Sequence, residues 1–235
     1  MISGHQLWMA LAVTLVFAGL GRWVRGVSFS GAVAGAIICF VLYGGAGPGA
    51  FAALVSVAAL AWFTTRLGYQ QKQTLGTAER REGRTASQVL ANLTVAAACA
   101  AIYAVFNREG IFLLAMAAAL SEAAADTVSS ELGQARSQKA LLITTWKQVP
   151  AGTDGGVSLA GTIAGIAAAG LVSLVCALTG LFPWRWLGTS VIAAIAGMLA
   201  DSYLGASLER RRWLSNNVVN FLSTVVAAGV ALLLA

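Results

Sequence analysis

The stretch that decides the fold is GIFLLAMAAALSEAAADTVSSEL, residues 110–132. It begins as an apolar run and acquires carboxylates only in its second half, at Glu122, Asp126 and Glu131. At about 1.5 Å per residue, a helix of this length crosses the roughly 30 Å hydrocarbon core of a bilayer. We therefore expect residues 110–132 to form a membrane span whose ionisable residues gather toward one membrane surface.

Apolar segments of similar length flank this stretch on both sides. The chain has 235 residues, of which 58% are hydrophobic and 10% charged, and its mean hydropathy is +0.78. Soluble domains average about 45–50% apolar and about 25% charged residues, so this composition excludes a soluble globule, a disordered chain and a nucleic-acid reader. We expect an all-α polytopic transmembrane helix bundle that forms a single domain over residues 1–235. Its eight expected spans are 4–21, 29–46, 48–66, 86–106, 110–132, 157–181, 184–207 and 216–235.

The basic residues predict the orientation of this bundle. If the loop after the first span is cytoplasmic and the sides alternate, the inside loops hold 13 of the 15 Lys and Arg residues. Only Arg108 and Arg185 then lie outside. Such a bias is the positive-inside signature, and the net charge of +6 also favours contact with anionic lipid headgroups. It predicts an inner-membrane protein with both termini extracytoplasmic and with cytoplasmic loops near 67–85, 133–156 and 208–215.

Polar residues gather at the helix ends that this orientation places in the cytoplasm. Glu122, Asp126 and Ser130 follow one another at four-residue intervals, so they share one helical face. Ionisable residues inside spans are costly and usually mark a site, so we expect four helices to wall one acidic pocket that opens to the cytosol. The other three helices carry the stripes Gly197, Asp201, Gly205; Asn216, Asn220, Ser223 (or Thr224); and Arg84, Gln88, Asn92.

The residue types in this pocket favour a hard cation bound together with phosphates. The three cysteines lie far apart in apolar stretches and His5 is the only histidine, which argues against zinc sites and removes histidine-based catalysis. Carboxylates and amides form the oxygen-rich ligand set of Mg²⁺, which usually binds one or two carboxylates plus substrate phosphates. The candidate metal ligands are Asp126, Glu131, Asp154 and Asp201, and the candidate catalytic residues are Asp126, Asp154 and Asp201.

A glycine-rich loop and nearby basic residues are the candidate phosphate ligands. The loop, residues 152–156 (GTDGG), precedes a predicted helix, and backbone N–H groups in such a place bind anions. It contains neither a P-loop nor a dinucleotide-binding fingerprint. Positive charge for further phosphate groups comes from Lys72, Arg80, Arg81 and Arg84. The candidate substrate- and nucleotide-binding residues are Lys72, Arg84, Gln88, Asn92, Ser130, Gly152, Thr153, Gly155, Gly156, Ser158, Ser202, Asn216, Asn217 and Asn220.

Four segments of the chain resemble signature motifs of one family of multi-span membrane proteins. They are ADTVSSELG (125–133), VPAGTDGGVS (149–158), DSYLGA (201–206) and NNVVNF (216–221). The family contains the plant phytyl-phosphate kinase of vitamin E synthesis together with bacterial, archaeal and animal members. The resemblance extends from about Ser28 to Phe221, with the four motifs in the same order. Ala151 stands where many relatives carry proline, a departure that removes no ligand.

This resemblance implies an enzyme that phosphorylates an isoprenoid monophosphate to the diphosphate with a nucleoside triphosphate, either ATP or CTP. Phytyl phosphate is the leading substrate. The lipid tail is expected between helices, its phosphate at the cytoplasmic membrane boundary, and Mg²⁺ between lipid and nucleotide. The resemblance places in the site Asp126, Ser130, Glu131, Thr153, Asp154, Asp201, Asn216, Asn217 and Asn220.

Other functions use similar features. A CTP-dependent lipid cytidylyltransferase needs a comparable site. A transporter or flippase for a small polar or phosphorylated solute also builds its site from broken helices with polar ends. A transporter is expected to hold its polar groups near the membrane midplane with access from both faces, whereas here they gather toward one face. This sidedness favours an enzyme, and the density of carboxylates within spans argues against a purely structural subunit.

Overall fold

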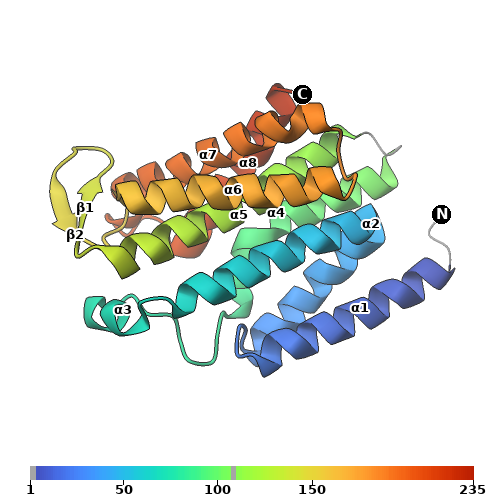
Figure 1. Cartoon of the computed structure of the whole chain (residues 1–235), viewed down its shortest axis with the longest axis horizontal. Helices are drawn as coiled ribbons and strands as arrows, with labels where there is room; N and C mark the ends of the chain where they lie inside the picture. Colours follow the sequence, from blue (N-terminus) through green and yellow to red (C-terminus); the bar gives the residue numbers. More distant parts are fainter. Residues whose placement is uncertain (1–3, 107–109) are drawn as a thin grey trace.

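The computed structural model describes residues 4–106 and 110–235, and helices dominate it (Figure 1). Within these residues, six helical stretches are long and apolar enough to cross a membrane, and Leu7–Trp23 adds a shorter apolar helix. The expected all-α helix bundle is therefore confirmed. The helices are α1 (Gly4–Trp23), α2 (Phe29–Arg66), α3 (Tyr69–Leu75), α4 (Ala86–Val105), α5 (Ile111–Arg136), α6 (Leu159–Leu178), α7 (Leu187–Leu204) and α8 (Asn216–Leu233).

Helix α2 combines two of the expected spans in one element. At its middle, Gly47 has φ +82° and ψ −167°, a conformation outside the helical region that glycine tolerates. Pro48 follows, and proline fits the first turn of a new helix because it has no N–H to leave unpaired. The chain turns back at this break (Figure 1), which brings the rings of Tyr43 and Phe51 to 6.0 Å. The break falls between the expected spans 29–46 and 48–66, while the total of eight spans stays a prediction.

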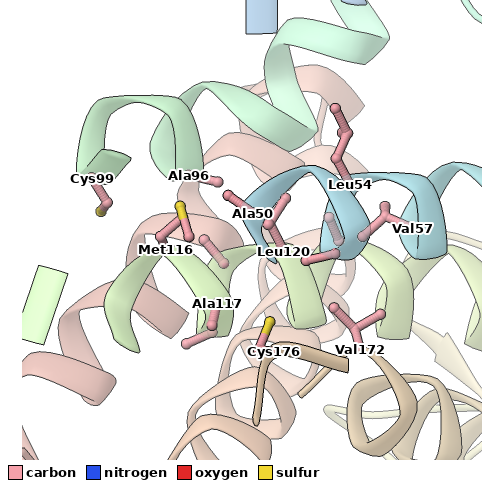
Figure 2. Close-up of a cluster of buried hydrophobic side chains, with 14 of the residues drawn as sticks. Ala50, Leu54, Val57, Ala96, Cys99, Met116, Ala117, Leu120, Val172 and Cys176 are labelled. Atoms are coloured by element: carbon pink, nitrogen blue, oxygen red, sulfur yellow. The ribbon is translucent and has the colours of Figure 1, made fainter. Parts of the chain in front are cut away.

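Helix α5 lies at the centre of the bundle and contacts α2, α4, α6, α7 and α8. Every residue from Leu113 to Ala125 is buried, and most of them are alanine. Small residues let neighbouring helices approach closely, which is how helices associate inside a bilayer. Figure 2 shows Met116, Ala117 and Leu120 of α5 among side chains of α2, α4 and α6. The helix that carries most of the expected acidic residues is thus held on all sides.

The loops at one end of the bundle carry structure of their own. In segment 133–156, β1 (Lys139–Leu142) pairs antiparallel with β2 (Gln148–Pro150) and with β3 (Gly156–Val157). Helix α3 occupies part of a second expected loop, 67–85. Figure 1 shows α3 and this sheet at one end, and the start of α1 and the end of α8 at the other. The start of α1 and the end of α8 therefore lie on the same side of the bundle. Which side is cytoplasmic stays a prediction, and Arg108 lies outside the described residues.

The loop before α4 is fixed to the turn between α1 and α2. Ser28 N donates to Arg84 O at 2.9 Å, and Arg84 N donates to Gly26 O at 3.1 Å. A Cβ on Gly31 would lie 2.1 Å from Arg84 O, and one on Gly83 would lie 2.5 Å from the carbonyl carbon of Gly26. Two glycines thus permit a backbone contact that no larger residue would allow, and the contact holds Arg84 against the start of α2.

Candidate functional site

A polar cavity of about 410 Å³ lies at the end of the bundle that carries α3 and the sheet. Its walls come from the starts of α4 and α8, the ends of α5 and α7, and the loop between β2 and β3. The structure therefore brings part of each of the four predicted polar stripes to one cavity, while Glu122, Gly197, Ser223 and Thr224 do not line it. The candidate residues that line this cavity are Arg84, Gln88, Asn92, Asp126, Ser130, Glu131, Gly152, Thr153, Asp154, Gly155, Gly156, Ser158, Asp201, Ser202, Asn216 and Asn220.

The polar cavity is strongly acidic. Among the described residues that line it, Arg84 is the only basic one. Six carboxylates line the same space, from Glu79, Asp126, Glu131, Asp154, Asp201 and Glu209. A site with this balance attracts cations and repels a bare phosphate group, so an anionic ligand needs accompanying positive charge to enter it.

Asp126 of α5 and Asp201 of α7 approach each other closely enough for direct side-chain contact. In the described part of the chain, four buried side-chain oxygens find no hydrogen-bond partner, and two of them, Asp201 Oδ2 and Asn220 Oδ1, belong to residues that line this cavity. The amide nitrogen of Asn220 lies 3.5 Å from Asn92 Oδ1. Buried polar atoms of this kind are rare, and each points to a ligand, ion or water that would complete its coordination. These two oxygens belong to the polar stripes of α7 and α8, which both reach the cavity.

This donor set fits a divalent cation that shares its ligands with phosphate. Within residues 4–106 and 110–235, no three Asp, Glu, His or Cys side chains form a ready-made metal cage. The Asp126–Asp201 pair supplies two carboxylates, and Mg²⁺ usually takes one or two carboxylates and completes its shell with waters and substrate phosphates. Asp154 is exposed at the tip of the glycine loop, at another wall of the same cavity.

The glycine loop is held at the cavity by the sheet and by the end of α7. Gly155 has φ +74°, and a Cβ there would lie 2.4 Å from the backbone nitrogen of Ala206. Thr153 Oγ1 donates to the carbonyl oxygen of Pro150 at 2.7 Å and closes the turn. The short strand β3 lies between this loop and α6. The loop's N–H groups therefore belong to a turn and not to the first turn of a helix.

Arg84 stands where the polar cavity meets a second, apolar cavity. The apolar one has a volume of about 1020 Å³ and lies between α1, α2 and α4. Glu79, Arg84, Gln88, Asn92 and Thr127 line both cavities. The guanidinium nitrogens of Arg84 lie 3.4 and 3.5 Å from Thr127 Oγ1. Arg84 is therefore within reach of a ligand in either space.

Two candidate ligands, Lys72 and Glu131, pair with each other. Lys72 Nζ is buried and donates to Glu131 Oε2 at 2.5 Å and to the carbonyl oxygens of Thr64 at 3.1 Å and Thr65 at 2.7 Å. An ammonium has three donors, so none is left for a phosphate. Thr65 Oγ1 donates to Glu131 Oε1 at 3.1 Å, so both carboxylate oxygens are also occupied. Lys72 does not line the polar cavity, and neither does Asn217.

Lys72→Met is therefore expected to destabilise the fold rather than to weaken only nucleotide binding. Removing one partner of a buried ion pair costs about 3–5 kcal/mol, because the other charge is left uncompensated. Unfolding in mixed SDS micelles measures the loss. Adding Glu131→Gln removes the stranded charge and is expected to recover much of the stability. Unchanged unfolding of Lys72→Met, together with weaker nucleotide binding, would return Lys72 to the role of a phosphate ligand.

Two carboxylates of the cavity, Glu79 and Glu209, were not predicted by the sequence analysis. Glu209 ends a π-helical turn, Gly205–Glu209, whose extra residue changes the face that α7 presents. Four-residue spacing does not detect such a turn, although π turns are frequent at functional sites. Glu79 comes from the loop before α4, where its Oε2 accepts from Gln88 Nε2 at 2.9 Å. Loop residues carry no periodic signal, so the sequence offers no comparable sign for Glu79.

The chain matches a family of integral membrane proteins and is similar to several known proteins. Residues 12–228 match the family described as "Integral membrane protein DUF92". The chain is 29% identical to "Protein VTE6, chloroplastic" of Arabidopsis thaliana, over 99% of this chain and 73% of that protein. It is 31% identical to an uncharacterized membrane protein of Methanocaldococcus jannaschii, over 97% of this chain and 94% of that one. A membrane protein of Synechocystis sp. is 34% identical over 72% of this chain and 67% of its own length.

No solved structure matches the chain. The family match covers all four motifs on which the resemblance was drawn, and that resemblance is confirmed. The chain belongs to the DUF92 family of integral membrane proteins.

Proposed function

We propose that the protein is a membrane-bound kinase that transfers the γ-phosphoryl group of a nucleoside triphosphate to a prenyl monophosphate, giving the prenyl diphosphate. The observation that carries the proposal is the acidic cavity walled by α4, α5, α7 and α8 at one end of an apolar bundle. Membership of the family adds support, because the four motifs resemble those of the plant phytyl-phosphate kinase. Phytyl phosphate is accordingly the leading substrate.

The charge of the cavity favours a nucleotide that arrives with a cation. The cavity carboxylates other than Glu131, which pairs with Lys72, would repel a free triphosphate, and we assign to Asp126 and Asp201 the role of holding Mg²⁺ against it. Asp154, on the facing loop, is placed to contribute a further oxygen. A bound metal ion would neutralise the negative charge that develops on the phosphate oxygens during transfer.

The chain's own residues have separate tasks in this reaction. Arg84 donates to the phosphate oxygens of the lipid at the junction of the two cavities. Asn92, Asn216 and Asn220 offer amide groups that orient the nucleotide. An oxygen of the lipid phosphate forms the new bond to the γ-phosphorus while the bond to the departing nucleoside diphosphate breaks. The lipid phosphate is already ionised, so no residue needs to remove a proton, which suits a site without histidine.

A transfer assay on purified protein in detergent tests this proposal. With γ-³²P-labelled ATP or CTP and a series of prenyl monophosphates, label is expected in the lipid diphosphate. EDTA is expected to abolish the transfer, and excess MgCl₂ to restore it. Transfer from α-labelled CTP, with none from γ-labelled nucleotide, would identify a cytidylyltransferase instead. If folded protein transfers no label from either, the kinase proposal is wrong and transport of a phosphorylated solute becomes the function to test.

A further inference from the structure

The apolar cavity between α1, α2 and α4 is more than twice the volume of the polar one, at about 1020 Å³. Its lining is mostly Ala, Gly, Val and Leu, and extends along α1 from Ala12 to the residues after Trp23. At about 1.5 Å per residue, this stretch of α1 measures roughly 20 Å, which is about two thirds of the hydrocarbon core. The cavity is therefore long, apolar and parallel to a helix, as a binding site for an extended hydrocarbon chain would be.

One end of the apolar cavity is rimmed by arginines. They are Arg25, Arg66, Arg80, Arg81 and Arg84. Among the described residues, the one ion pair joins Lys72 to Glu131, so no carboxylate lies within salt-bridge distance of any of the five guanidinium groups. Arg66 is held in place, since it stacks on the ring of Trp62 at 4.1 Å and donates to Val24 O at 2.6 Å. Guanidinium groups without an ion-pair partner at the mouth of an apolar cavity are complementary to an anionic head group.

We propose that this cavity holds the chain of a single-chain lipid monophosphate, with the phosphate at the arginine rim. The proposal rests on the kinase function proposed above and names the binding site of the lipid substrate. The two cavities share five lining residues around Arg84, so a phosphate at the rim lies beside the polar cavity where the nucleotide binds. Helix α1 packs on α2 at the edge of the bundle (Figure 1), and the lipid enters from the bilayer beside it.

Gly35 makes this proposal testable by chain length. It lines the apolar cavity, and a Cβ built on it meets nothing within 4 Å. It lies six residues after Phe29, the first residue of α2, which is roughly 9 Å along the helix from the arginine rim. A phenylalanine at this position would occupy the space of the lipid chain beyond its first part. Long chains should then be excluded, while short ones still bind.

The matched control is Gly44, which belongs to the same helix. A Cβ on Gly44 also meets nothing within 4 Å, but Gly44 does not line the cavity. Gly44→Phe therefore adds the same side chain to α2 without filling the proposed site. Gly35→Leu is a second test variant, since it fills less of the cavity and is expected to give a smaller effect of the same kind.

The experiment is photolabelling with a diazirine-bearing C20 prenyl monophosphate in detergent, without nucleotide. We expect adducts on residues that line the apolar cavity, at least tenfold less labelling in Gly35→Phe, and unchanged labelling in Gly44→Phe. An unlabelled C20 monophosphate in excess should compete, whereas the C20 alcohol and a two-chain phosphatidic acid should compete at least tenfold less well. In transfer assays, Gly35→Phe should lose C20 activity and keep activity on a C5 monophosphate.

The outcomes separate this proposal from the kinase function. Adducts in the cavity from a protein that transfers no phosphate would support the lipid site and contradict the kinase. Transfer of phosphate by a protein whose adducts all lie on other surfaces would support the kinase and contradict the lipid site. Equal loss of C5 and C20 activity in folded Gly35→Phe and Gly35→Leu would overturn the lipid site. Equal competition by phosphatidic acid would assign the cavity to ordinary bilayer lipid.

Discussion

Asp126→Asn and Asp201→Asn are each expected to lower phosphoryl transfer by roughly 10³-fold or more, while the protein stays folded. The amide keeps the shape of the side chain but removes the negative charge that holds a divalent cation. The two carboxylates approach each other, so neutralising one also relieves repulsion between like charges. Stability is therefore expected to stay constant or to rise. Loss of activity without loss of stability is the result that separates a functional carboxylate from a structural one.

The transfer assay and thermal unfolding in detergent measure the two effects together, and a Mg²⁺ titration adds a third. Both variants should need more Mg²⁺ for any remaining activity. Glu82→Gln is the control, because Glu82 is an exposed carboxylate of the loop before α4 that lines neither cavity. It should retain activity within about twofold, as surface substitutions generally do. Full activity in both aspartate variants would show that the proposal of a metal site in this cavity is wrong.

Arg84→Gln is expected to lower kcat/KM for the lipid monophosphate by about 10²-fold or more. The backbone of Arg84 is tied to the turn between α1 and α2, which fixes its guanidinium at the junction of the two cavities. A guanidinium group binds phosphate through two parallel hydrogen bonds, whereas the lysine ammonium group is a point charge at the end of a flexible side chain. Arg84→Lys should therefore recover only part of the loss.

Steady-state kinetics with the lipid and the nucleotide varied in turn will locate the effect of Arg84. We expect kcat/KM to fall more for the lipid than for the nucleotide, since Arg84 belongs to the arginine rim. Arg22→Gln is the control, because Arg22 is exposed at the end of α1 and lines neither cavity. A change for Arg22→Gln as large as that for Arg84→Gln would indicate a general effect of positive charge. Unaltered kinetics in Arg84→Gln would exclude a role for this residue in the reaction.

The sequence predicted the features that depend on local pattern. Hydropathy predicted the helical segments, because each residue of a membrane span must itself be apolar enough to enter the bilayer. The bounds of the apolar segments also placed the break before Pro48. Four-residue spacing placed Asp126, Asp201 and Asn220 on faces that the structure brings to one cavity. This prediction was possible because side chains at that spacing share one face of any helix, whatever surrounds the helix.

Features that depend on contacts between distant segments were beyond the sequence. Lys72 carried a predicted phosphate role because nothing in its neighbourhood indicates that Glu131 lies beside it. Glu209 was missed because a π turn shifts the helical phase. The apolar cavity was also not foreseen, since alanine and glycine on a helix face look alike whether they pack against a neighbour or line a space. Gly35 and Gly45 illustrate this, because only a Cβ on Gly45 would meet α4, 2.7 Å from Ala100 O.

The burial of α5 on every side has a consequence for how the chain enters the membrane. Alone, α5 is expected to enter lipid less readily than an uncharged span, because its apolar surface is mostly alanine and it carries Glu122, Asp126 and Glu131. On insertion scales, an aspartate at the centre of a helix costs about 2.5–3.5 kcal/mol. Three of its partners, α6, α7 and α8, are synthesised after it. We therefore expect α5 to enter the bilayer only after α6, α7 and α8 have been synthesised. The acidic helix would then insert together with the helices that pack around it.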